Sequence, residues 1–559
     1  MTTKQDRHIL IAIIALSILL RVVVALFLGN AIEETRGGTF DQISYDALAL
    51  RVAGGHGFSF ATDWWPGVHA DQPTAFWSYL YTLYLAVVYT LFGHAPLIAR
   101  LIQAVLVGAA MPWLTWRIGG RIFGRRPALI AAAISAVYFY FILYAASLMS
   151  EALYIVGVLW TVDAAMRLAA VLGDAGASAG RRWRLGLELG LAMGVTLLLR
   201  QAIAPFLAVL ALWFLWLAWR RGWLRRAIGP LAAAALLMAL LLLPFVVRNY
   251  RAFGVVGMPN TNVGINFFWA NHPIYGTQFE AVLSPEHGIS YQELIPPELR
   301  GLNDALLDRA LLDRGVQIVL DDPGRYLLLS LSRIPIYFQF WPTPQSSLLS
   351  NAARLLSFGL FLPFMLYGLV LALVDARRGR FTAGAGHPGS ASEPPGEPTQ
   401  DLRLAYLSLV LCFMATYTLV HIASWANVRY RLPVDAFWIL FAGYAIDNLL
   451  HRLSNRRAHS PSPINHSPIH HSPIPHSQLT IPQFTIHQLT IPPPQLTIPQ
   501  FPIPQLTIPP PQFTIPQLTY SPIHHSPTSP CHQFNHSPLL LLSLRLRKSP
   551  VLTKSHLRR

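Results

Sequence analysis

About ten apolar stretches, each roughly 20 residues long, are spread over residues 1–450 and constrain the fold of this chain more than any motif does. They lie at residues 8–28, 97–116, 128–147, 152–170, 185–199, 201–219, 228–247, 350–374, 403–422 and 433–450. A helix of this length crosses the hydrocarbon core of a bilayer, and it satisfies its own backbone hydrogen bonds there. The sequence therefore predicts an all-α polytopic membrane protein.

Composition agrees with this prediction. Charged residues make up 12% of the chain, whereas a typical soluble domain has about 25%. The net charge of +16 does not indicate a nucleic-acid partner, because the basic residues cluster at the ends of the apolar stretches, where they set topology. Cys412 and Cys531 lack the spacing of a disulfide framework or a metal site. The first stretch has no small-residue cleavage site behind it, so we interpret it as an anchor.

Arginine-rich loops indicate the orientation. Segment 75–92 is apolar enough to cross the membrane, but a crossing there would turn the basic loops at 117–126, 181–184 and 220–226 outward. Basic loops usually face the cytoplasm, so we interpret 75–92 as a helix that lies in the outer interface. The N-terminus is then cytoplasmic in a multi-pass protein of the bacterial plasma membrane. Loops at about 29–96 and 248–348 lie outside.

Composition also divides the chain into four parts. We expect an N-terminal transmembrane catalytic module at 1–247, a small outer cap at 248–348, and C-terminal transmembrane helices at 349–454 with a cytoplasmic linker at 376–402. Within the cap, helical periodicity predicts a helix over 302–320. Proline-rich HSPI and QLTIP repeats fill the tail at 455–559, which we predict to be disordered. Whether this tail functions or is translated non-coding sequence stays open.

Asp41 is the first candidate for chemistry. It starts the short amphipathic segment DQISYDALALRVA, and Tyr45 follows one helical turn later on the same face. A carboxylate at the membrane surface can deprotonate or orient an acceptor hydroxyl. An aspartate at this position can equally cap the helix, so both interpretations stay open. We interpret Asp46 as solvated surface.

Glu151 is the second candidate. It lies in LMSEALYIV, at the outer junction of two spans in an otherwise uncharged stretch. Ionisable groups in apolar membrane segments are costly and usually functional. The alternative is that Glu151 caps the next span together with Ser150. The expected topology places Asp41 and Glu151, which are far apart in sequence, at the same outer face.

Four arginines also reach the outer ends of spans: Arg200, Arg248, Arg429 and Arg431. Outward arginines oppose the usual charge bias, and a lipid phosphate that they bind would explain them. The alternative is that they anchor span ends by snorkelling, and we expect at least one to do only that. Arg21 lies inside the first span and needs a partner, for either a structural role or a site role.

Metal binding has little support. The first-loop residues His56, His69, Asp63 and Asp71 leave a divalent cation open as an alternative, but no paired ligand spacing favours one. The sequence contains no phosphate-binding loop, dinucleotide fingerprint or nucleophile elbow. We therefore expect no required cofactor.

Several motifs carry a family resemblance in their order and spacing. They are DQISYDALALRVAGGHGFSF, PLIARLIQAV, GGRIFGRRPALIAAAISAV, LMSEALY, LLLRQAIAP, PFVVRNYRAFGVVGMPNTNVGINFFWANHP and RYRLPVDAF. Together they resemble GT-C-fold glycosyltransferases that use polyprenyl-phosphate sugars. The resemblance is to the branch that includes the bacterial family-39, protein-mannosyltransferase-like enzymes and the related aminoarabinose transferases.

The resemblance implies a bundle of about ten transmembrane helices with an interfacial helix in the first outer loop. It implies that Asp41 is the catalytic base, that Glu151 helps to build the site, and that Arg200, Arg248 and Asn271 lie near the donor phosphate. The reaction would be an inverting sugar transfer from a polyprenyl-phosphate donor to a hydroxyl acceptor. Two departures, Gln42 in place of a second acidic residue and Asp71-Gln72-Pro73 ahead of the interfacial helix, leave donor, acceptor and metal use open.

Two other functions stay open as alternatives. An O-antigen ligase or polymerase also has many spans and a large outer loop, but it would use a late outer loop as its site. A lipid or sugar transporter usually has internal repeats and charges at the membrane midplane, which this chain lacks. The sequence names neither the sugar nor the acceptor, which can be a glycan, a lipid or a protein, and it does not settle the oligomeric state.

Overall fold

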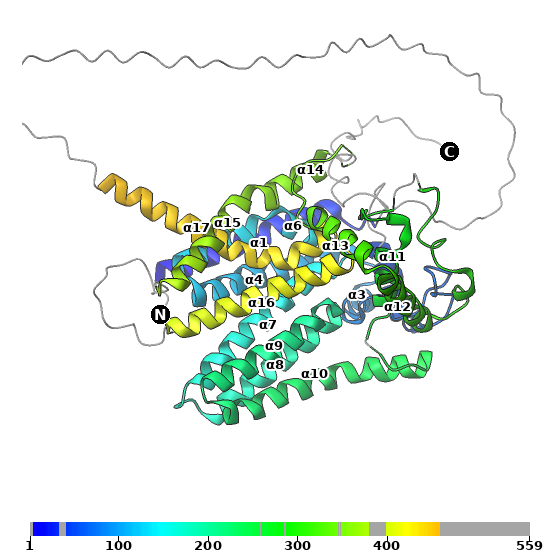
Figure 1. Ribbon diagram of the computed structural model, residues 1–559, viewed down its shortest axis with the longest axis horizontal. Helices are drawn as coiled ribbons and strands as arrows, with labels where there is room; N and C mark the ends of the chain where they lie inside the picture. The colour runs from blue at the N-terminus through cyan, green and yellow to red at the C-terminus, as the bar shows by residue number, and fades with distance from the viewer. Residues whose placement is uncertain are drawn as a thin grey trace, which may run out of the picture. The chain divides into compact units, whose positions relative to one another are not determined.

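The computed structural model describes residues 4–32, 41–257, 259–283, 287–344, 346, 348–379 and 399–458 (Figure 1). These residues form helices, and their β-structure is limited to isolated bridges in the first loop. The predicted tail beyond 458 and most of the linker lie outside the described residues. The main helices are α1 Lys4–Leu28, α2 Asp41–Ala53, α3 Tyr79–Phe92, α4 Pro96–Ile122, α5 Arg125–Val137, α6 Phe139–Ala146, α7 Glu151–Gly173, α8 Ala179–Leu199, α9 Ala204–Arg220, α10 Leu224–Phe253, α11 Val263–Asn271, α12 Asp304–Asp321, α13 Pro323–Tyr337, α14 Leu348–Arg354, α15 Leu360–Arg377, α16 Gln400–Ala423 and α17 Val428–Ala458.

The predicted fold class is confirmed. Seven described helical segments are long and apolar enough to cross a membrane, and the pair α5 and α6, bent by 52°, makes up to eight. α8 and α17 occupy two further predicted spans, but both carry more charged residues, such as Glu188 in α8 and Asp435 in α17. The helices form an all-α bundle whose number of spans roughly matches the expectation of about ten.

α3 covers most of the segment that the charge pattern excluded as a span. It has 14 residues, which at about 1.5 Å per residue is too short for a hydrocarbon core about 30 Å thick. Ser78 caps it, because the Ser78 side chain accepts a hydrogen bond from the Tyr81 amide at 3.3 Å. The helix that was expected at 75–92 therefore exists in shorter form, while its place in the outer interface stays a prediction.

α8 and α10 pack closely because one face of α8 carries small residues. A Cβ added at Gly186 would overlap the backbone of Pro230, and one added at Gly190 would overlap the backbone of Ala234. Such close backbone approach is typical of membrane helix pairs with small residues at every fourth position. The GLELGLAMG pattern of α8 thus determines how these two helices meet.

Arg21 has a structural partner, which settles one alternative from the sequence. The α5–α6 bend interrupts the helix and leaves carbonyl groups near the end of α5 without helical donors. Arg21 donates to the carbonyls of Ala136 at 3.0 Å and Ser135 at 3.1 Å, and to the hydroxyl of Ser17 at 2.6 Å. The side chain is fully buried and holds α1 against this bend.

The segment that was expected as an outer cap has a hydrophobic core of its own. α11, α12 and α13 enclose buried side chains that include Ile265, Trp269 and Leu311. α12 confirms the helix predicted over 302–320. The Asp304 carboxylate of α12 accepts hydrogen bonds from the Thr74 hydroxyl and the Ala75 amide, both at 2.7 Å. The two expected outer loops are therefore joined.

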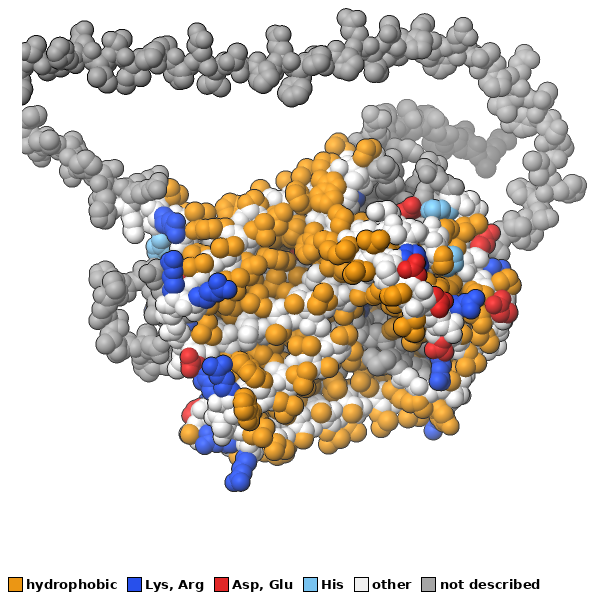
Figure 2. Space-filling model, in the orientation of Figure 1, with side chains coloured by type: hydrophobic (Ala, Val, Ile, Leu, Met, Phe, Trp, Pro, Cys, Tyr) orange, Lys and Arg blue, Asp and Glu red, His pale blue; other side chains and the backbone are white. Residues whose placement is uncertain are grey.

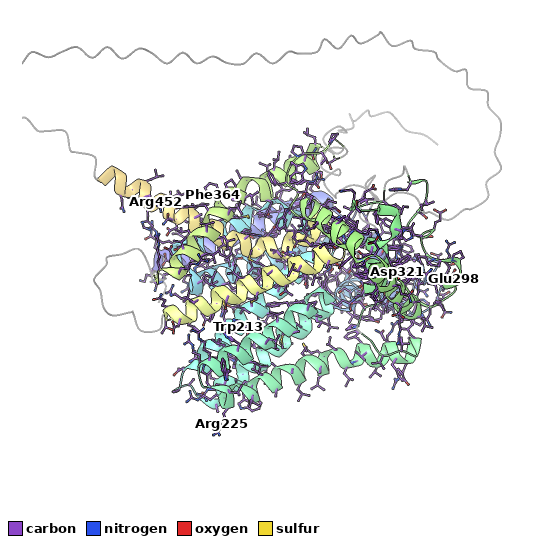
Figure 3. The ribbon with its side chains drawn as sticks, viewed as in Figure 1. Trp213, Arg225, Glu298, Asp321, Phe364 and Arg452 are labelled. Carbon is purple, nitrogen blue, oxygen red and sulfur yellow. The ribbon has the colours of Figure 1, made fainter. Side chains whose placement is uncertain are left out.

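The two ends of the helix bundle differ in charge. Figure 3 places Arg225 and Arg452 at one end and Glu298 and Asp321 at the other. In Figure 2, most of the charges on the visible face of the first end are basic, whereas the second end shows both signs. At the basic end, the fully buried Asp163 pairs with Arg167 at 2.9 Å and also with Arg117 and Arg121. Arg117 and Arg121 thus hold a buried carboxylate in addition to belonging to the basic segment 117–126 that indicated topology.

Candidate functional site

Four charged residues that the sequence singled out meet at one place. Asp41 begins α2, Glu151 begins α7, Arg200 directly follows α8, and Arg429 lies in the first turn of α17. Arg429 contacts the Asp41 carboxylate at 2.6 Å through Nη1 and the Glu151 carboxylate at 2.7 Å through Nε. Arg200 contacts the same Glu151 oxygen at 2.8 Å. Four separate helices thus supply one chain of ion pairs.

Burying the charges of this cluster costs desolvation free energy, which suggests that the cluster has a function. The Glu151 side chain is 4% exposed and the Arg429 side chain 14%, so both charges have lost most of their water. Removing paired charges from water costs several kcal/mol per ion, and such groups in membrane proteins usually serve function. The Asp41 side chain is 32% exposed. Arg429 contacts only its Oδ2, and no described residue bonds to Oδ1, which leaves one carboxylate oxygen for a substrate.

The cluster lies in the wall of a cavity of about 920 Å³. Aromatic side chains cover much of the wall, and amide side chains lie between them. The aromatic residues are Tyr45, Trp64, Trp65, Phe76, Trp77, Tyr140, Tyr144, Phe267, Trp269, Tyr291, Tyr417, Trp425 and Tyr430; the amides are Gln201, Asn260, Asn262, Asn266, Gln339 and Asn427. A cavity of this size with a few convergent polar groups is typical of a ligand site. Aromatic faces and amides suit a sugar, which has both apolar faces and hydroxyl groups.

Tyr45 supports this wall from α2. Its hydroxyl lies 3.4 Å from the Ser150 hydroxyl and 3.4 Å from the Ser78 amide, and its ring meets Tyr81 edge-on. Burial, and next the nearby Asp41 charge, raise the pKa of Tyr45 to about 12. The phenol is therefore neutral near pH 7 and serves as a hydrogen-bonding group rather than as a base.

The structure does not bring three of the expected residues into the cavity wall. Arg248 donates to the Thr74 carbonyl at 2.9 Å and the Tyr79 hydroxyl at 2.8 Å, so it fastens the first loop to α10. Arg431 is fully buried, pairs with Asp435 at 2.9 Å, and donates to the Tyr337 carbonyl.

Asn271 is also buried away from the cavity. Its side-chain oxygen accepts a hydrogen bond from Arg333 at 2.8 Å, and its amide donates to the Phe267 carbonyl at 2.8 Å. Both groups are thereby used inside the core of the second loop. The contacts of Arg248, Arg431 and Asn271 are structural ones, because each side chain finds its partners within the protein.

Sequence reasoning missed Arg354 and most of the aromatic and amide wall. Arg354 ends α14 and lines the cavity, but it lies in a stretch without a recognisable motif. Three of the six amides, Asn260, Asn262 and Asn266, come from the GMPNTNVGIN stretch that had only been quoted for its resemblance. Gln201 donates to Asn262 at 2.7 Å, which joins the loop after α8 to the second loop. The polar residues in that otherwise apolar stretch were the one feature of the sequence that could have indicated the amides of the cavity wall.

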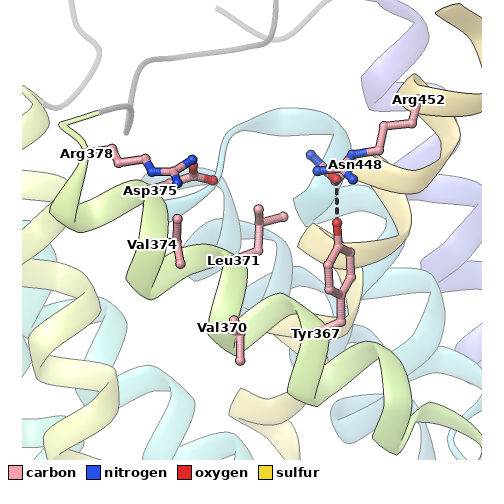
Figure 4. A pocket seen from close by; sticks show the side chains of 8 residues that line it. All are labelled: Tyr367, Val370, Leu371, Val374, Asp375, Arg378, Asn448 and Arg452. Carbon is pink, nitrogen blue, oxygen red and sulfur yellow. Dashed lines mark hydrogen bonds between the residues drawn. The ribbon is translucent and has the colours of Figure 1, made fainter.

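No metal cluster is indicated within the described ranges. No group of three or more His, Cys, Asp or Glu side chains there could hold a metal ion. In the first loop, Asp63 accepts from the Ala70 amide and Asp71 pairs with Arg51. A smaller cavity of about 370 Å³ lies between α15 and α17, where Tyr367 donates to Asn448 at 2.9 Å (Figure 4). None of the expected site residues lines it.

Comparison with known proteins identifies the fold. Residues 75–247 match the family model described as dolichyl-phosphate-mannose-protein mannosyltransferase. The oligosaccharyltransferase of Archaeoglobus fulgidus, in a structure tethered to an acceptor peptide with the NVT sequon, superposes with a TM-score of 0.50. Its sequence identity is 16%, over 82% of this chain and 51% of that one. The chain has the GT-C fold.

Two other GT-C structures are similar at lower scores. The A. fulgidus oligosaccharyltransferase AglB, in complex with an inhibitory peptide and a dolichol-phosphate, has a TM-score of 0.48 and 16% identity over 81% of this chain and 51% of that one. ArnT from Cupriavidus metallidurans, bound to undecaprenyl phosphate, has a TM-score of 0.32 and 15% identity over 74% of this chain and 77% of that one. This GT-C chain spans about half the length of the oligosaccharyltransferases that it matches. Comparison with curated protein sequences gave no match.

Proposed function

We propose that this GT-C protein is a membrane glycosyltransferase that moves a sugar from a polyprenyl-phosphate donor to a hydroxyl acceptor. The observation that carries the proposal is the half-buried Asp41 carboxylate, whose Oδ1 makes no bond to a described residue, in the wall of a large cavity lined by aromatic and amide groups. The family model that matches residues 75–247 describes enzymes with a dolichyl-phosphate-mannose donor, which supports a lipid-phosphate sugar. The sugar is a hexose or a pentose, and the acceptor belongs to a cell-envelope glycan, a lipid or a protein.

The proposed reaction is a single inverting displacement. The acceptor oxygen attacks the anomeric carbon and forms a new C–O bond, while the bond from that carbon to the phosphate oxygen breaks. The acceptor proton moves to Asp41 Oδ1, and the polyprenyl phosphate leaves with the bonding electrons. A phosphate monoester is a good leaving group, so this scheme requires neither a metal ion nor another cofactor.

Glu151 and the two arginines are proposed to position Asp41. Arg429 reaches both carboxylates, and Arg200 fixes Glu151 from the opposite side. Arginine suits this position because its planar guanidinium can donate in two directions at once. The cluster would keep the Asp41 carboxylate directed toward the cavity before the acceptor arrives.

The proposed site faces the outer side of the bacterial plasma membrane. The arginine-rich loops at 117–126, 181–184 and 220–226 support this orientation, because basic loops face the cytoplasm. α2, the start of α7 and the end of α8 then all reach the opposite face. Membrane lipids and the lipid-linked donor are the expected partners, and nucleic acid is not.

An O-antigen ligase or polymerase is the second candidate, because the second loop also lines the cavity. Asn262, Trp269 and Tyr291 come from that loop. A ligase of this kind would depend on the second loop and tolerate the loss of the Asp41 charge. Dependence on Asp41 therefore separates the two functions.

The test is sugar transfer in membranes that express the protein. A panel of radiolabelled polyprenyl-phosphate sugars would be offered to wild type, Asp41→Asn and Glu151→Gln at equal expression. We expect label in product with wild type for at least one donor, and loss of most of it in both variants. Absence of transfer from every donor would contradict the proposal, and transfer unchanged by Asp41→Asn would favour the ligase.

A further inference from the structure

The charges in the cavity wall do not balance. Three arginines and two carboxylates line the cavity: Arg200, Arg354, Arg429, Asp41 and Glu151. Arg200 and Arg429 are held by the two carboxylates at 2.6–2.8 Å, so their charges are compensated. Arg354 remains as the excess positive charge of the wall, which suits a ligand with negative charge.

Arg354 has only neutral partners among the described residues. Its guanidinium donates to the Ser346 hydroxyl at 2.6 Å and to the Thr343 hydroxyl at 3.3 Å. No described carboxylate pairs with it. Ser346, Ser350 and Tyr140 line the cavity with Arg354 and add hydroxyl groups. One guanidinium among hydroxyl donors is a typical phosphate environment, because phosphate oxygens accept several hydrogen bonds at once.

The surface beside Arg354 is apolar enough for a lipid tail. Four leucines of α14, α15 and the single π-helical turn between them are exposed: Leu348, Leu355, Leu356 and Leu360. Figure 2 shows hydrophobic side chains covering this part of the molecule, over the α14 and α15 of Figure 1. An amphiphile whose phosphate lies at Arg354 could thus leave its chain along apolar surface.

We propose that Arg354 binds the phosphate of a polyprenyl phosphate, and that Arg200 and Arg429 do not. This inference rests on the proposed function and assigns a different residue from those expected from the sequence. The two roles follow from the ion pairs. Arg200 and Arg429 contact carboxylates and position the base, whereas Arg354 has no carboxylate partner among the described residues and binds the phosphate. A free phosphate has the same headgroup chemistry but lacks the apolar chain.

The test measures binding by the full-length protein in detergent rather than transfer. Wild type, Arg354→Gln, Arg354→Lys and Arg251→Gln would be titrated with undecaprenyl phosphate, with the uncharged polyprenol, and with inorganic phosphate. Arg251 is the matched control, because it is an exposed arginine in the last turn of α10 and does not line the cavity. Thermal unfolding of each variant shows whether it is folded.

We expect Arg354→Gln to weaken undecaprenyl phosphate binding at least about tenfold, as the loss of one charge-assisted contact predicts. Arg354→Lys should retain part of the affinity and Arg251→Gln all of it, while polyprenol binds weakly to every form. Inorganic phosphate should bind more weakly than the lipid, since it lacks the chain. Equal affinity of Arg354→Gln and wild type for undecaprenyl phosphate would overturn the inference.

The two proposals fail in different ways. If wild type binds undecaprenyl phosphate independently of Arg354, the phosphate lies elsewhere and the proposed function still stands. If wild type binds inorganic phosphate through Arg354 but does not bind the lipid, both the lipid assignment and the proposed donor are overturned. If Arg354→Gln is unfolded, Arg354→Lys decides. A loss of affinity for undecaprenyl phosphate with unchanged affinity for polyprenol supports the inference, and unchanged affinity for undecaprenyl phosphate overturns it.

Discussion

At the scale of single residues, Arg429 connects the two carboxylates of the proposed site. It lies between Asp41 and Glu151 and bonds to both. Without it, two carboxylates would share a poorly solvated site with one fewer positive charge, and breaking a buried pair typically costs about 3–5 kcal/mol. Substitutions that keep or remove the positive charge of Arg429 can therefore show whether its contacts to both carboxylates matter beyond the charge itself.

We predict that Arg429→Gln lowers both the rate of sugar transfer and the thermal stability. Arg429→Lys should keep the fold but lose about tenfold or more in kcat/KM, because an ammonium group cannot contact both carboxylates as a guanidinium does. Initial rates and unfolding temperatures of the purified variants would check this. Wild-type rates in Arg429→Gln would show that the ion-pair chain has no part in positioning.

The sequence predicted the two carboxylates of this site but not which arginines contact them. Asp41 and Glu151 stood out because isolated carboxylates at span ends are rare, and the structure joins them through Arg429. Arg248 looked equivalent to Arg200 in sequence, yet its partners are backbone carbonyls of the first loop. Partner choice depends on tertiary contacts, which spacing along the chain does not reveal.

At the scale of helices, α8 and α10 are joined through backbone contacts at Gly186 and Gly190. We predict that Gly190→Val lowers the unfolding temperature in detergent, because overpacking typically costs about 1–3 kcal/mol. Gly180→Val on the same helix is the matched control, since open space surrounds Gly180. Equal unfolding temperatures for the two variants would mean that the helices do not meet as described.

Asp304 connects α12 to the first loop, and this contact should depend on pH. Burial raises the pKa of Asp304 to about 6, although hydrogen bonds from Ala75 and from threonine side chains oppose the rise. Because the folded value lies above the unfolded value of about 3.9, folding takes up a proton, and stability falls as pH rises from about 4 to 6. Asp308 of the same helix shifts in the same direction.

We therefore predict that the unfolding temperature decreases between pH 4.5 and pH 7, and that Asp304→Asn removes part of this decrease. An asparagine oxygen can still accept from Thr74 and Ala75, because both donate to the same carboxylate oxygen. Calorimetry or fluorescence in detergent across this pH range would measure the unfolding temperatures of wild type and Asp304→Asn. An identical pH dependence in the variant would contradict the role of Asp304.

At the scale of the whole molecule, apolar length and arginine placement were enough to predict an all-α membrane bundle and a helix at 75–92, of which the structure forms 79–92. They could not reveal the α5–α6 bend or the role of Arg21, because both depend on a contact between helices that are distant in sequence. The cavity wall escaped prediction for the same reason. Its aromatic residues come from both loops and several helices, and an aromatic residue in an apolar chain carries no distinctive pattern.

We predict that a chain ending at residue 458 keeps sugar transfer and lipid binding. Every described residue of the cavity wall precedes this point, and none of the residues proposed for the chemistry lies in the proline-rich repeats that follow. Transfer rates of the truncated and full-length proteins, compared at equal membrane insertion, would check it. Loss of transfer in a correctly inserted truncated protein would assign a role to the tail.

The most direct test of the central claim compares two aspartates of α2. Asp41→Asn removes the proposed base. Asp46 was expected to be solvated surface, but this expectation was wrong, because its side chain is buried and accepts a hydrogen bond from Tyr89 at 2.6 Å. Asp46→Asn thus changes an aspartate of the same helix that does not line the cavity. Transfer from a polyprenyl-phosphate sugar would be measured for both at matched expression and unfolding temperature. We predict a loss of about 100-fold or more for Asp41→Asn and near wild-type transfer for Asp46→Asn. Equal transfer by the two variants would contradict the assignment of Asp41 as the base.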